Sequence, residues 1–78
     1  MQKLDLNLLH ALSALLQEGS VVAASRRLGI TPSATSRALA RLRDVTGDPL
    51  LVRAGRGLVP SPRAAQIKQQ LPRVMEEV

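Results

Sequence analysis

The feature that most constrains the fold of this chain is a connection of about three residues between two helical segments. The first segment presents one narrow face of small and medium side chains at helical spacing: Val21, Ala24, Ser25 and Leu28. Ser20 precedes it as an N-cap, and Gly29 suits the left-handed residue that ends a helix. Thr31 and Pro32 then indicate the cap and first-turn proline of the next helix. Small residues on the first helix allow the two helices to pack closely.

The segment before this pair predicts a longer helix. It follows Asp5, which is placed to cap the free amides, and it ends at Gly19. Its leucines recur at helical spacing: Leu8, Leu9, Leu12, Leu15 and Leu16. One side of this helix is therefore expected to face the core.

The chain changes character after residue 46. Residues 47–49, Gly-Asp-Pro, close the third helix. Residues 50–53 and 58–59 predict two short strands about a glycine-rich turn, and such a ribbon must lean on the helices because it is barely stable alone. Ser61 and Pro62 repeat the cap-plus-proline opening for a fourth helix, which Pro72 interrupts. The predicted order is helix, helix, tight turn, helix, ribbon, helix.

Composition excludes several classes of protein. At 78 residues the chain is one small domain, and without cysteine it has neither disulfides nor a thiolate metal site. It has no Phe, Tyr or Trp, so its core is aliphatic and it cannot stack the bases of single-stranded nucleic acid on rings. No apolar run approaches the roughly 18 residues of a membrane span, and the N-terminal stretch lacks the layout of a signal peptide. These observations point to the cytoplasm and not to a membrane.

The net charge of +5 is concentrated in the middle of the chain. Residues 26–63 contain eight arginines and only two acidic residues, whereas the two ends are close to neutral. Such a patch favours a polyanionic partner, and nucleic acid more than a membrane because the basic residues do not lie along one amphipathic helix. On charge alone, a solubilising surface is an equal alternative.

The helix expected over residues 32–46 has two distinct sides. Its core side carries Thr35, Ala38, Leu39, Leu42 and Val45. The opposite side carries Ser33, Ser36, Arg37, Ala40, Arg41 and Asp44. Two helices joined by a short turn with glycine form the helix-turn-helix unit, whose second helix enters the major groove of DNA by its N-terminal end. The polar side is therefore a candidate reader of DNA.

Individual residues on this side have different expected roles. Arg37 is the best candidate for a base contact because the guanidinium fork matches the two acceptors on the guanine edge. Ser33 and Ser36 are small polar residues in the first turn, where free amides favour a phosphate. Arg41 and Arg43 lie further along, where contact with the DNA backbone is expected. For each arginine, simple solvation is the alternative.

The ribbon supplies a second candidate contact with DNA. Arg53 and Arg56 flank a glycine turn that can approach a phosphate backbone or minor groove closely. The alternative is an ordinary hairpin turn with solvated arginines.

Little in the sequence points to catalysis. His10 has no second histidine or cysteine and no carboxylate at ligand spacing, so it is interpreted as a surface or interface residue. The serines lack an identifiable base, and the adjacent Glu76 and Glu77 point in different directions on a helix. We expect no enzymatic activity, no metal and no cofactor.

Taken together, these segments resemble the N-terminal domain of LysR-type transcriptional regulators. The resemblance lies in the order and spacing of GSVVAASRRL (19–28), ITPSATSRALARLR (30–43), GDPLLVR (47–53) and GRG (55–57), and it spans essentially the whole chain. It implies a mainly α, winged helix-turn-helix fold with a three-helix core, a short two-stranded wing and a long C-terminal linker helix for dimerisation. Residues 1–60 would form the DNA-binding domain and residues 61–78 the start of the linker. A C-terminal domain that binds a small-molecule inducer would lie beyond this chain.

The resemblance also implies which residues contact DNA. Ser33, Ser36 and Arg37 match positions where the family contacts DNA from its recognition helix, and Arg53 matches the wing arginine. The full predicted DNA-binding set is Ser20, Thr31, Pro32, Ser33, Ser36, Arg37, Arg41, Arg53 and Arg56. The recognition helix, about residues 32–46, would lie in the major groove, and the wing, residues 50–59, at the minor groove or backbone. The family binds interrupted inverted repeats as dimers or dimers of dimers.

Three departures from the family pattern matter. Many members have Gln-Pro where this chain has Pro32-Ser33, so a preferred DNA sequence does not transfer. Val22 and Ala23 replace a commonly polar pair, which removes phosphate contacts from the second helix. Thr46 replaces a common large apolar residue, so that end of the core is expected to be looser.

The last helix carries an apolar stripe whose partner the sequence leaves open. The stripe consists of Ala64, Ile67, Leu71, Val74, Met75 and Val78. A subunit interface is favoured because so small a chain cannot easily bury every leucine alone; packing back onto the first helix is the alternative. The predicted function is sequence-specific binding of double-stranded DNA by a homodimer, with a tetramer as the further option in a longer protein. The alternative function is a small helical protein-interaction module without specific DNA readout.

Overall fold

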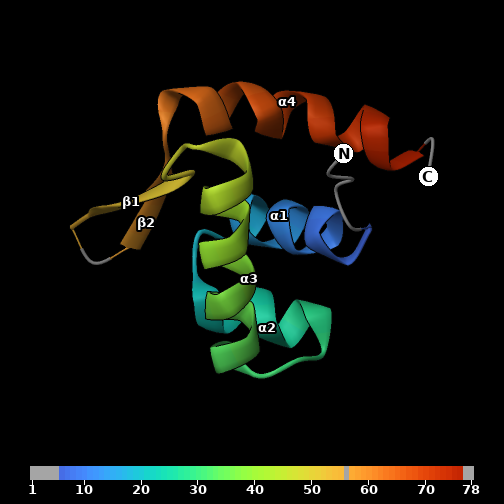
Figure 1. The fold of residues 1–78 in the computed structure, drawn as a ribbon, viewed down its shortest axis with the longest axis vertical. Helices are drawn as coiled ribbons and strands as arrows, with labels where there is room; N and C mark the ends of the chain where they lie inside the picture. The colour runs from blue at the N-terminus through green and yellow to red at the C-terminus, as the bar shows by residue number, and fades with distance from the viewer. Residues whose placement is uncertain (1–5, 56, 77–78) are drawn as a thin grey trace.

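The computed structural model describes residues 6–55 and 57–76. Within them the chain forms four helices and one two-stranded antiparallel sheet (Figure 1). The elements follow in the order α1 (Leu6–Glu18), α2 (Val21–Leu28), α3 (Pro32–Thr46), β1 (Leu51–Ala54), β2 (Gly57–Pro60) and α4 (Pro62–Glu76). The predicted order of elements is confirmed, including a helix over residues 32–46.

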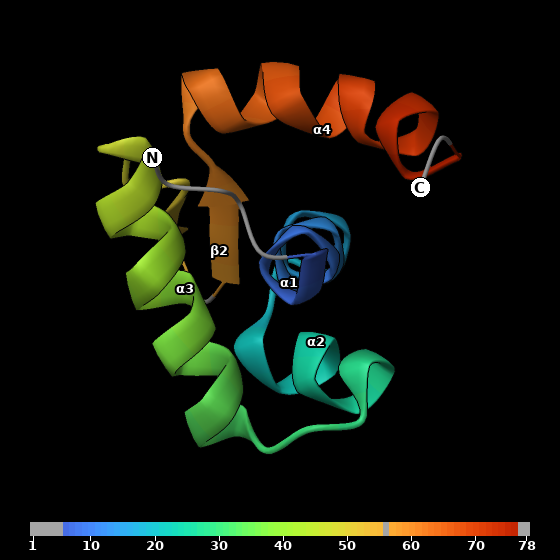
Figure 2. The same cartoon turned by 45° about the vertical axis from the view of Figure 1, so that its right-hand side comes forward.

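Helix α1 is the centre of the core. Figure 2 looks along α1, with α4 above it, α2 below it and α3 to the left. Its leucines at positions 12, 15 and 16 are buried, as the periodicity predicted, whereas Leu8 and Leu9 are half-buried against the same cluster. Because apolar residues cover most of the circumference of α1, this helix packs against α2, α3 and α4. Each of those helices therefore needs only one apolar side.

The predicted caps position α2 and α3. The Ser20 hydroxyl accepts a hydrogen bond from the amide of Ala23 at 3.2 Å, and the Thr31 hydroxyl accepts one from Ala34 at 3.1 Å. Gly29 ends α2 at φ +73°, a conformation that costs glycine little. The turn between the two helices is therefore fixed by local interactions at both ends. The cap expected at Asp5 lies outside the described residues.

The two strands form a short wing with a simple register. Leu51 pairs with Pro60, and Arg53 pairs with Leu58. Gly55 lies in the turn at φ +61°. Leu51 is buried in the core, and Leu58 packs against the core cluster. One face of the wing therefore packs against the helices. This contact was expected because a two-stranded sheet is barely stable on its own.

Helix α4 runs through position 72 without a break, so the proline expected to interrupt it does not end the helix. Its stripe requires a correction. Ala64 and Leu71 are buried within the chain's own core, because α4 packs against α1, so neither is available to a second subunit. Ile67 is half-buried. The side chains of Val74, Met75 and Val78 lie outside the described residues.

One residue of the predicted core side of α3 is also corrected. Val45 is 44% exposed, although Thr35, Leu39 and Leu42 on the same side are buried. Val45 lies three residues after Leu42, about 60° round the helix, and this offset turns it away from α1. It lines a shallow depression with Arg41 on the outer surface instead.

In the described part of the chain, no helix is long and apolar enough to cross a membrane.

Candidate nucleic-acid interface

The outer side of α3 faces solvent, as the helix-turn-helix interpretation requires. Ser33, Ser36, Arg37 and Arg41 are all exposed. On the opposite side Thr35 is fully buried, and its hydroxyl donates to the carbonyl of Thr31 at 3.0 Å, which satisfies it without water. The two sides of α3 therefore separate a packed interior from a polar face that is free to meet a ligand.

The N-terminal end of α3 offers fewer free amides than the sequence suggested. Pro32 has no N–H, Ala34 donates to the Thr31 hydroxyl, and Thr35 donates to the Thr31 carbonyl at 3.0 Å. Among the described residues the Ser33 amide is left as the one first-turn donor without a partner. An anion at this end would meet one backbone N–H together with the Ser33 and Thr31 hydroxyls.

Two arginines of the outer side have no internal partner. Neither Arg37 nor Arg41 makes a hydrogen bond or an ion pair with any residue that the structure describes. They lie four residues apart on one helix, where like charges repel by a few tenths of a kcal/mol. A bound phosphate or base acceptor would relieve this repulsion, so the pair is suited to an anionic ligand.

Arg43, expected to contact the DNA backbone, also makes two hydrogen bonds within the chain. Its Nε donates to the carbonyl of Pro49 at 2.8 Å, and its Nη2 donates to that of Leu51 at 3.0 Å. These bonds fasten the start of the wing to α3. Arg27 is likewise engaged: its Nη1 donates to Gln17 and lies 3.3 Å from the carboxylate of Glu18.

A cleft of about 210 Å³ lies between the wing and the start of α2. Ser20 and Arg53, two members of the predicted DNA-binding set that are distant in sequence, both line it. Gly19 makes this approach possible, because at φ +64° a Cβ there would lie 3.2 Å from the carbonyl oxygen of Leu58. Arg53 is the one charged residue among those that line the cleft, and Ser20 brings a hydroxyl. Arg56, the other predicted wing contact, lies outside the described residues.

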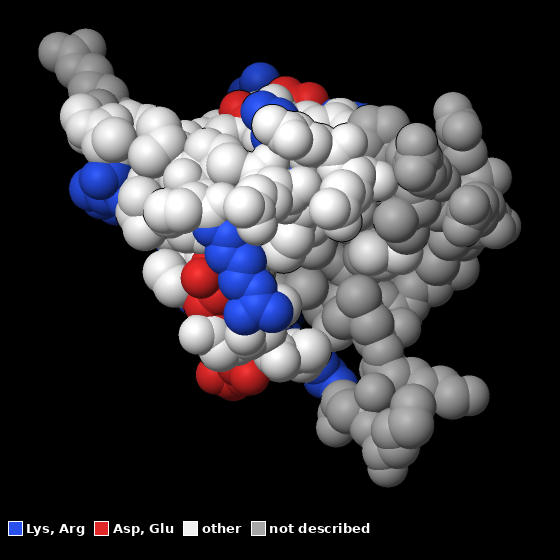
Figure 3. Space-filling model, turned by 90° about the horizontal axis from the view of Figure 1, so that it is seen from above, with Lys and Arg blue, Asp and Glu red and all other residues white. Residues whose placement is uncertain are grey.

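The described surface on the α4 side carries charges of both signs. In Figure 3, which views the molecule from that side, Lys and Arg side chains are separated by uncharged surface, and acidic side chains lie beside some of them. On the outer side of α3, Arg37 and Arg41 line a shallow depression together with one acidic residue, Asp44.

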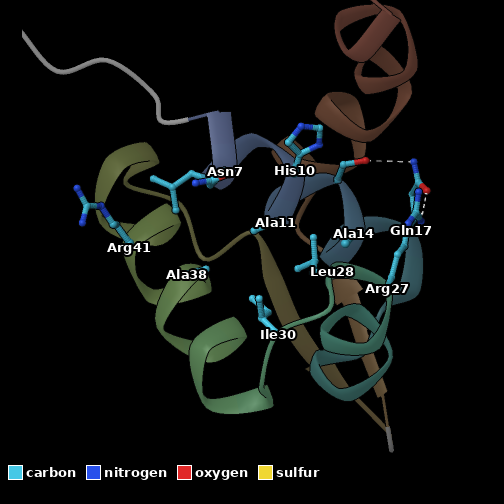
Figure 4. Close-up of a pocket in the computed structure, with 12 residues that line it drawn as sticks. Asn7, His10, Ala11, Ala14, Gln17, Arg27, Leu28, Ile30, Ala38 and Arg41 are labelled. Carbon is cyan, nitrogen blue, oxygen red and sulfur yellow. Dashed lines mark hydrogen bonds between the residues drawn. The ribbon is translucent and has the colours of Figure 1, made fainter. Parts of the chain in front are cut away.

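A larger hollow of about 810 Å³ lies between α1, the C-terminal end of α2 and the middle of α3 (Figure 4). Arg41 is the one member of the predicted DNA-binding set that lines it. His10 is exposed at its edge, which confirms the interpretation of a surface residue. Within residues 6–55 and 57–76 no group of three His, Cys, Asp or Glu side chains is placed to hold a metal ion.

Sequence reasoning missed one polar residue, Asp48. Its carboxylate accepts hydrogen bonds from the Ser61 hydroxyl at 2.6 Å and from the Leu50 amide at 2.8 Å. These two bonds, with a smaller contribution from the positive charge of Arg63, hold the pKa of Asp48 below its ordinary value of 3.8 against a smaller opposing effect of burial. The sequence signal for this bond was the Gly-Asp-Pro turn itself. In such turns an Asp side chain often accepts a hydrogen bond from the backbone amide two residues on.

The α1–α2–α3 core, with a short turn before an exposed α3 and a two-stranded wing after it, defines a winged helix-turn-helix protein. Residues 6–65 match the bacterial regulatory helix-turn-helix proteins of the lysR family. This chain belongs to that family, which confirms the resemblance seen in the sequence.

Relatives in this family are considerably longer than the chain. It is 49% identical over 75 residues to the HTH-type transcriptional regulator SyrM 1 of Sinorhizobium fredii, a match covering 96% of this chain and 22% of that protein. It is 48% identical over 68 residues to the HTH-type transcriptional regulator YidZ of Salmonella newport, covering 87% of this chain and 21% of that protein. The chain thus spans about a fifth of these curated relatives.

Solved structures share the fold. The probable transcriptional regulator PA0477 from Pseudomonas aeruginosa is 38% identical with a TM-score of 0.87, over 92% of this chain and 24% of that one. The DNA-binding domain of BenM, in complex with benA site 1 DNA, is 24% identical with a TM-score of 0.85, over 95% of this chain and 83% of that one. The second likeness is one of fold alone.

Proposed function

We propose that this chain binds double-stranded DNA sequence-specifically as the DNA-binding part of a LysR-type transcriptional regulator. The observation that carries the proposal is the exposed outer side of α3, where Arg37 has no partner among the described residues and Ser33 and Ser36 lie beside it. In the winged helix-turn-helix fold this is the helix that enters the major groove. The BenM domain has the same fold and was solved with DNA, which supports this mode of docking.

The predicted contacts divide into base reading and backbone positioning. Arg37 would read a guanine edge with both of its terminal nitrogens, and Ser33 and Ser36 would contact neighbouring bases or phosphate oxygens. Thr31 already accepts a bond as the cap of α3, yet its hydroxyl hydrogen is available to a phosphate. Pro32 offers an apolar ring at the same end.

The remaining contacts would position the protein on the duplex. Arg41 lies one turn further from the N-terminus of α3 and would meet the sugar-phosphate backbone. Ser20 and Arg53 would hold a phosphate between them in the cleft beside the wing. Arg56 would extend this contact from the wing turn toward the minor groove. We place the wing contacts in residues 50–59.

Dimerisation through α4 is the second part of the proposal. With Ala64 and Leu71 used in the core, the surface available to a partner is reduced to Ile67 and the predicted residues beyond it, Val74, Met75 and Val78. Two copies related by a twofold axis would read an interrupted inverted repeat. We further propose residues 1–60 as the DNA-binding domain and residues 61–78 as the start of a linker. A longer protein would add an inducer-binding domain and assemble as a dimer or tetramer.

The other predicted properties follow from this role. A regulator of this kind acts on the bacterial chromosome, so we propose a cytoplasmic location. Its function is recognition, and we propose no catalytic activity. The protein-interaction module without DNA readout is disfavoured because the chain belongs to a family of regulatory helix-turn-helix proteins.

Fluorescence anisotropy with labelled duplexes tests the proposal. Duplexes are first selected from a random library by the chain, and the affinities for selected and random duplexes are then measured at increasing salt. Because phosphate contacts release counterions, affinity should fall steeply with salt for both, and the selected duplex should bind about a thousandfold more tightly. Equal affinity for selected and random duplexes at every salt concentration would refute sequence-specific binding.

A further inference from the structure

The junction between α3, the wing and α4 is cross-linked by one carboxylate. Asp48 lies in the loop after α3, and its Oδ2 accepts from the Leu50 amide at 2.8 Å and from the Ser61 hydroxyl at 2.6 Å. Ser61 is buried and immediately precedes α4. The same hydroxyl accepts from the Ala64 amide at 3.0 Å, so it is also the N-cap of α4. Asp48 therefore acts directly on the residue that starts α4.

Each of the two helix ends at this junction lies next to a side chain of favourable charge. The first turn of α4 has no acidic residue of its own, and the carboxylate of Asp48, from the α3 side, supplies the negative charge that a helix N-terminus favours. In return Arg63, in the first turn of α4, donates to the carbonyl of Thr46 at 3.4 Å. Thr46 is the last residue of α3, where a positive charge is favoured. Arg63 thus adds a positive charge to that of Arg43 at the end of α3, and Asp48 supplies a negative charge at the start of α4.

The loop between them has one well-defined conformation. Leu50 is fully buried at φ +64°, a left-handed backbone conformation that non-glycine residues rarely adopt. Its amide is bound by Asp48, and its carbonyl accepts from the Ser61 amide at 2.9 Å. The Thr46 hydroxyl donates to Leu42 at 2.8 Å and accepts from the Asp48 amide at 3.3 Å. A strained residue persists only where its surroundings over-determine it, and here they do so on both sides.

Apolar packing alone would not fix the direction of α4 so closely. The contact of α4 with α1 uses a stripe of Ala64, Ile67 and Leu71. Burial of apolar surface is non-directional and allows the helix to tilt or slide, whereas hydrogen bonds through one carboxylate have defined directions.

We infer that Asp48 is a positioning residue that, through Ser61, fixes the direction in which α4 leaves the helix-turn-helix core. Where α4 pairs two copies, this direction sets the separation at which their α3 helices meet DNA. The second statement rests on the proposed function; the first does not.

Distances between spin labels on α3 and α4 test the first statement. The chain has no cysteine, so labels at Ala40→Cys on exposed α3 and Lys68→Cys on exposed α4 are unique, and dilution into unlabelled chain isolates the distance within one subunit. Pulsed electron paramagnetic resonance should give one narrow distance distribution. Ser61→Ala should broaden it, whereas Asp48→Asn, which keeps an acceptor oxygen, should leave it narrow. An unchanged width in Ser61→Ala would overturn the inference.

Two further variants keep this test decisive. Asp48→Ala removes the acceptor itself and should broaden the distribution at least as much as the serine variant, provided that circular dichroism shows it folded. Ser25→Ala is the matched control, because it also removes one buried hydroxyl, whose hydrogen bond to Val22 at 2.7 Å lies within α2 and far from the junction in sequence. It should leave the width unchanged. If the control broadens the distribution equally, general loosening explains the effect and the inference fails.

DNA binding tests the second statement. Duplexes carry one selected half-site, or two half-sites with a series of spacers. Ser61→Ala should bind the single half-site within about twofold of the parent, lose about tenfold on the preferred spacer and accept a wider range of spacers, because avidity requires matched geometry. An equal loss on single and paired half-sites would overturn a positioning role. If the parent chain selects no duplex, the proposed function fails, and the spin-label distances still decide the first statement.

Discussion

Two arginines of α3, Arg41 and Arg43, are expected to have different roles, one in DNA binding and one in stability. Arg43 donates to the carbonyls of Pro49 and Leu51, whereas Arg41 makes no bond with the described residues. Loss of a hydrogen bond to a charged donor costs about 1.5–3 kcal/mol where the acceptor stays buried, and much less where it is exposed. Since only the bond to Leu51 is partly buried, Arg43→Ala should lower the free energy of unfolding by about 2 kcal/mol.

Arg41→Ala is the matched control, because it removes the same side chain two residues away. It should change stability by less than about 0.5 kcal/mol, as surface substitutions usually do. At fixed protein concentration, melting followed by circular dichroism at 222 nm should show Arg43→Ala about 8–16 °C below the parent. Circular dichroism is the appropriate probe because the chain has no aromatic residue to fluoresce.

DNA binding should show the opposite ranking. Measured well below the melting temperature, Arg41→Ala should weaken binding to all duplexes alike, whereas Arg43→Ala should affect it less. Equal melting temperatures for the two variants would refute the structural role of Arg43. A greater loss of DNA affinity in Arg43→Ala than in Arg41→Ala would refute the assignment of backbone contact to Arg41.

Substitutions at Gly19, Asp48 and Ile67 test the backbone geometry, the lowered pKa and the α4 surface. Gly19→Ala should destabilise the fold by more than Gly55→Ala in urea denaturation: both force a positive φ costing about 1–2 kcal/mol, but only at Gly19 does the new Cβ meet a wing carbonyl at 3.2 Å; equal losses would contradict this. Because the pKa of Asp48 is lowered in the folded state, its ionised carboxylate stabilises the fold fully above pH 3.8, and this stabilisation is lost as the pH falls through the folded pKa. In a series of melting temperatures against pH, Asp48→Asn should therefore lose less stability on the acid side than the parent. An unchanged pH profile would contradict the assignment. Ile67→Glu should weaken self-association in sedimentation equilibrium, whereas Lys68→Glu, exposed on the same helix, should not; a shared effect would indicate charge alone.

Local interactions explain why the helix boundaries were predictable. A cap such as Ser20 or Thr31 bonds to an amide three residues away, and Gly29 ends a helix through its own backbone conformation. Those signals lie within a few residues of sequence, so they can be read directly. The exposed side of α3 was predictable for the same reason, since helical periodicity alone separates Ser33, Arg37 and their neighbours from the core.

Interactions between distant segments were not predictable in this way. Arg43 bonds to the wing only because residues 49–51 fold back toward α3, and nothing in its spacing distinguishes it from Arg41. The bond between Asp48 and Ser61 joins residues 13 apart through a strained leucine. Helical spacing also gave no sign that the Thr46 hydroxyl donates to the carbonyl of Leu42 and accepts from the amide of Asp48.

The fate of the α4 stripe also depended on tertiary structure. An apolar side can be buried by the same chain or by a second one, and periodicity does not distinguish these outcomes. Ala64 and Leu71 proved to be core residues because α1 has an unfilled side that accepts them. The half-buried Ile67 follows from its position between them, at the edge of that contact.

In the proposed function, Arg37 reads base pairs from the exposed side of α3. Its most direct test is to select duplexes from one random library with the parent chain and with Arg37→Ala, and to compare the base preference at each position. Arg37→Ala should lose the preference for guanine at one position per half-site, about 1–3 kcal/mol of discrimination, while the other positions keep theirs. Identical base preferences from the two chains, or a uniform loss at every position, would contradict it.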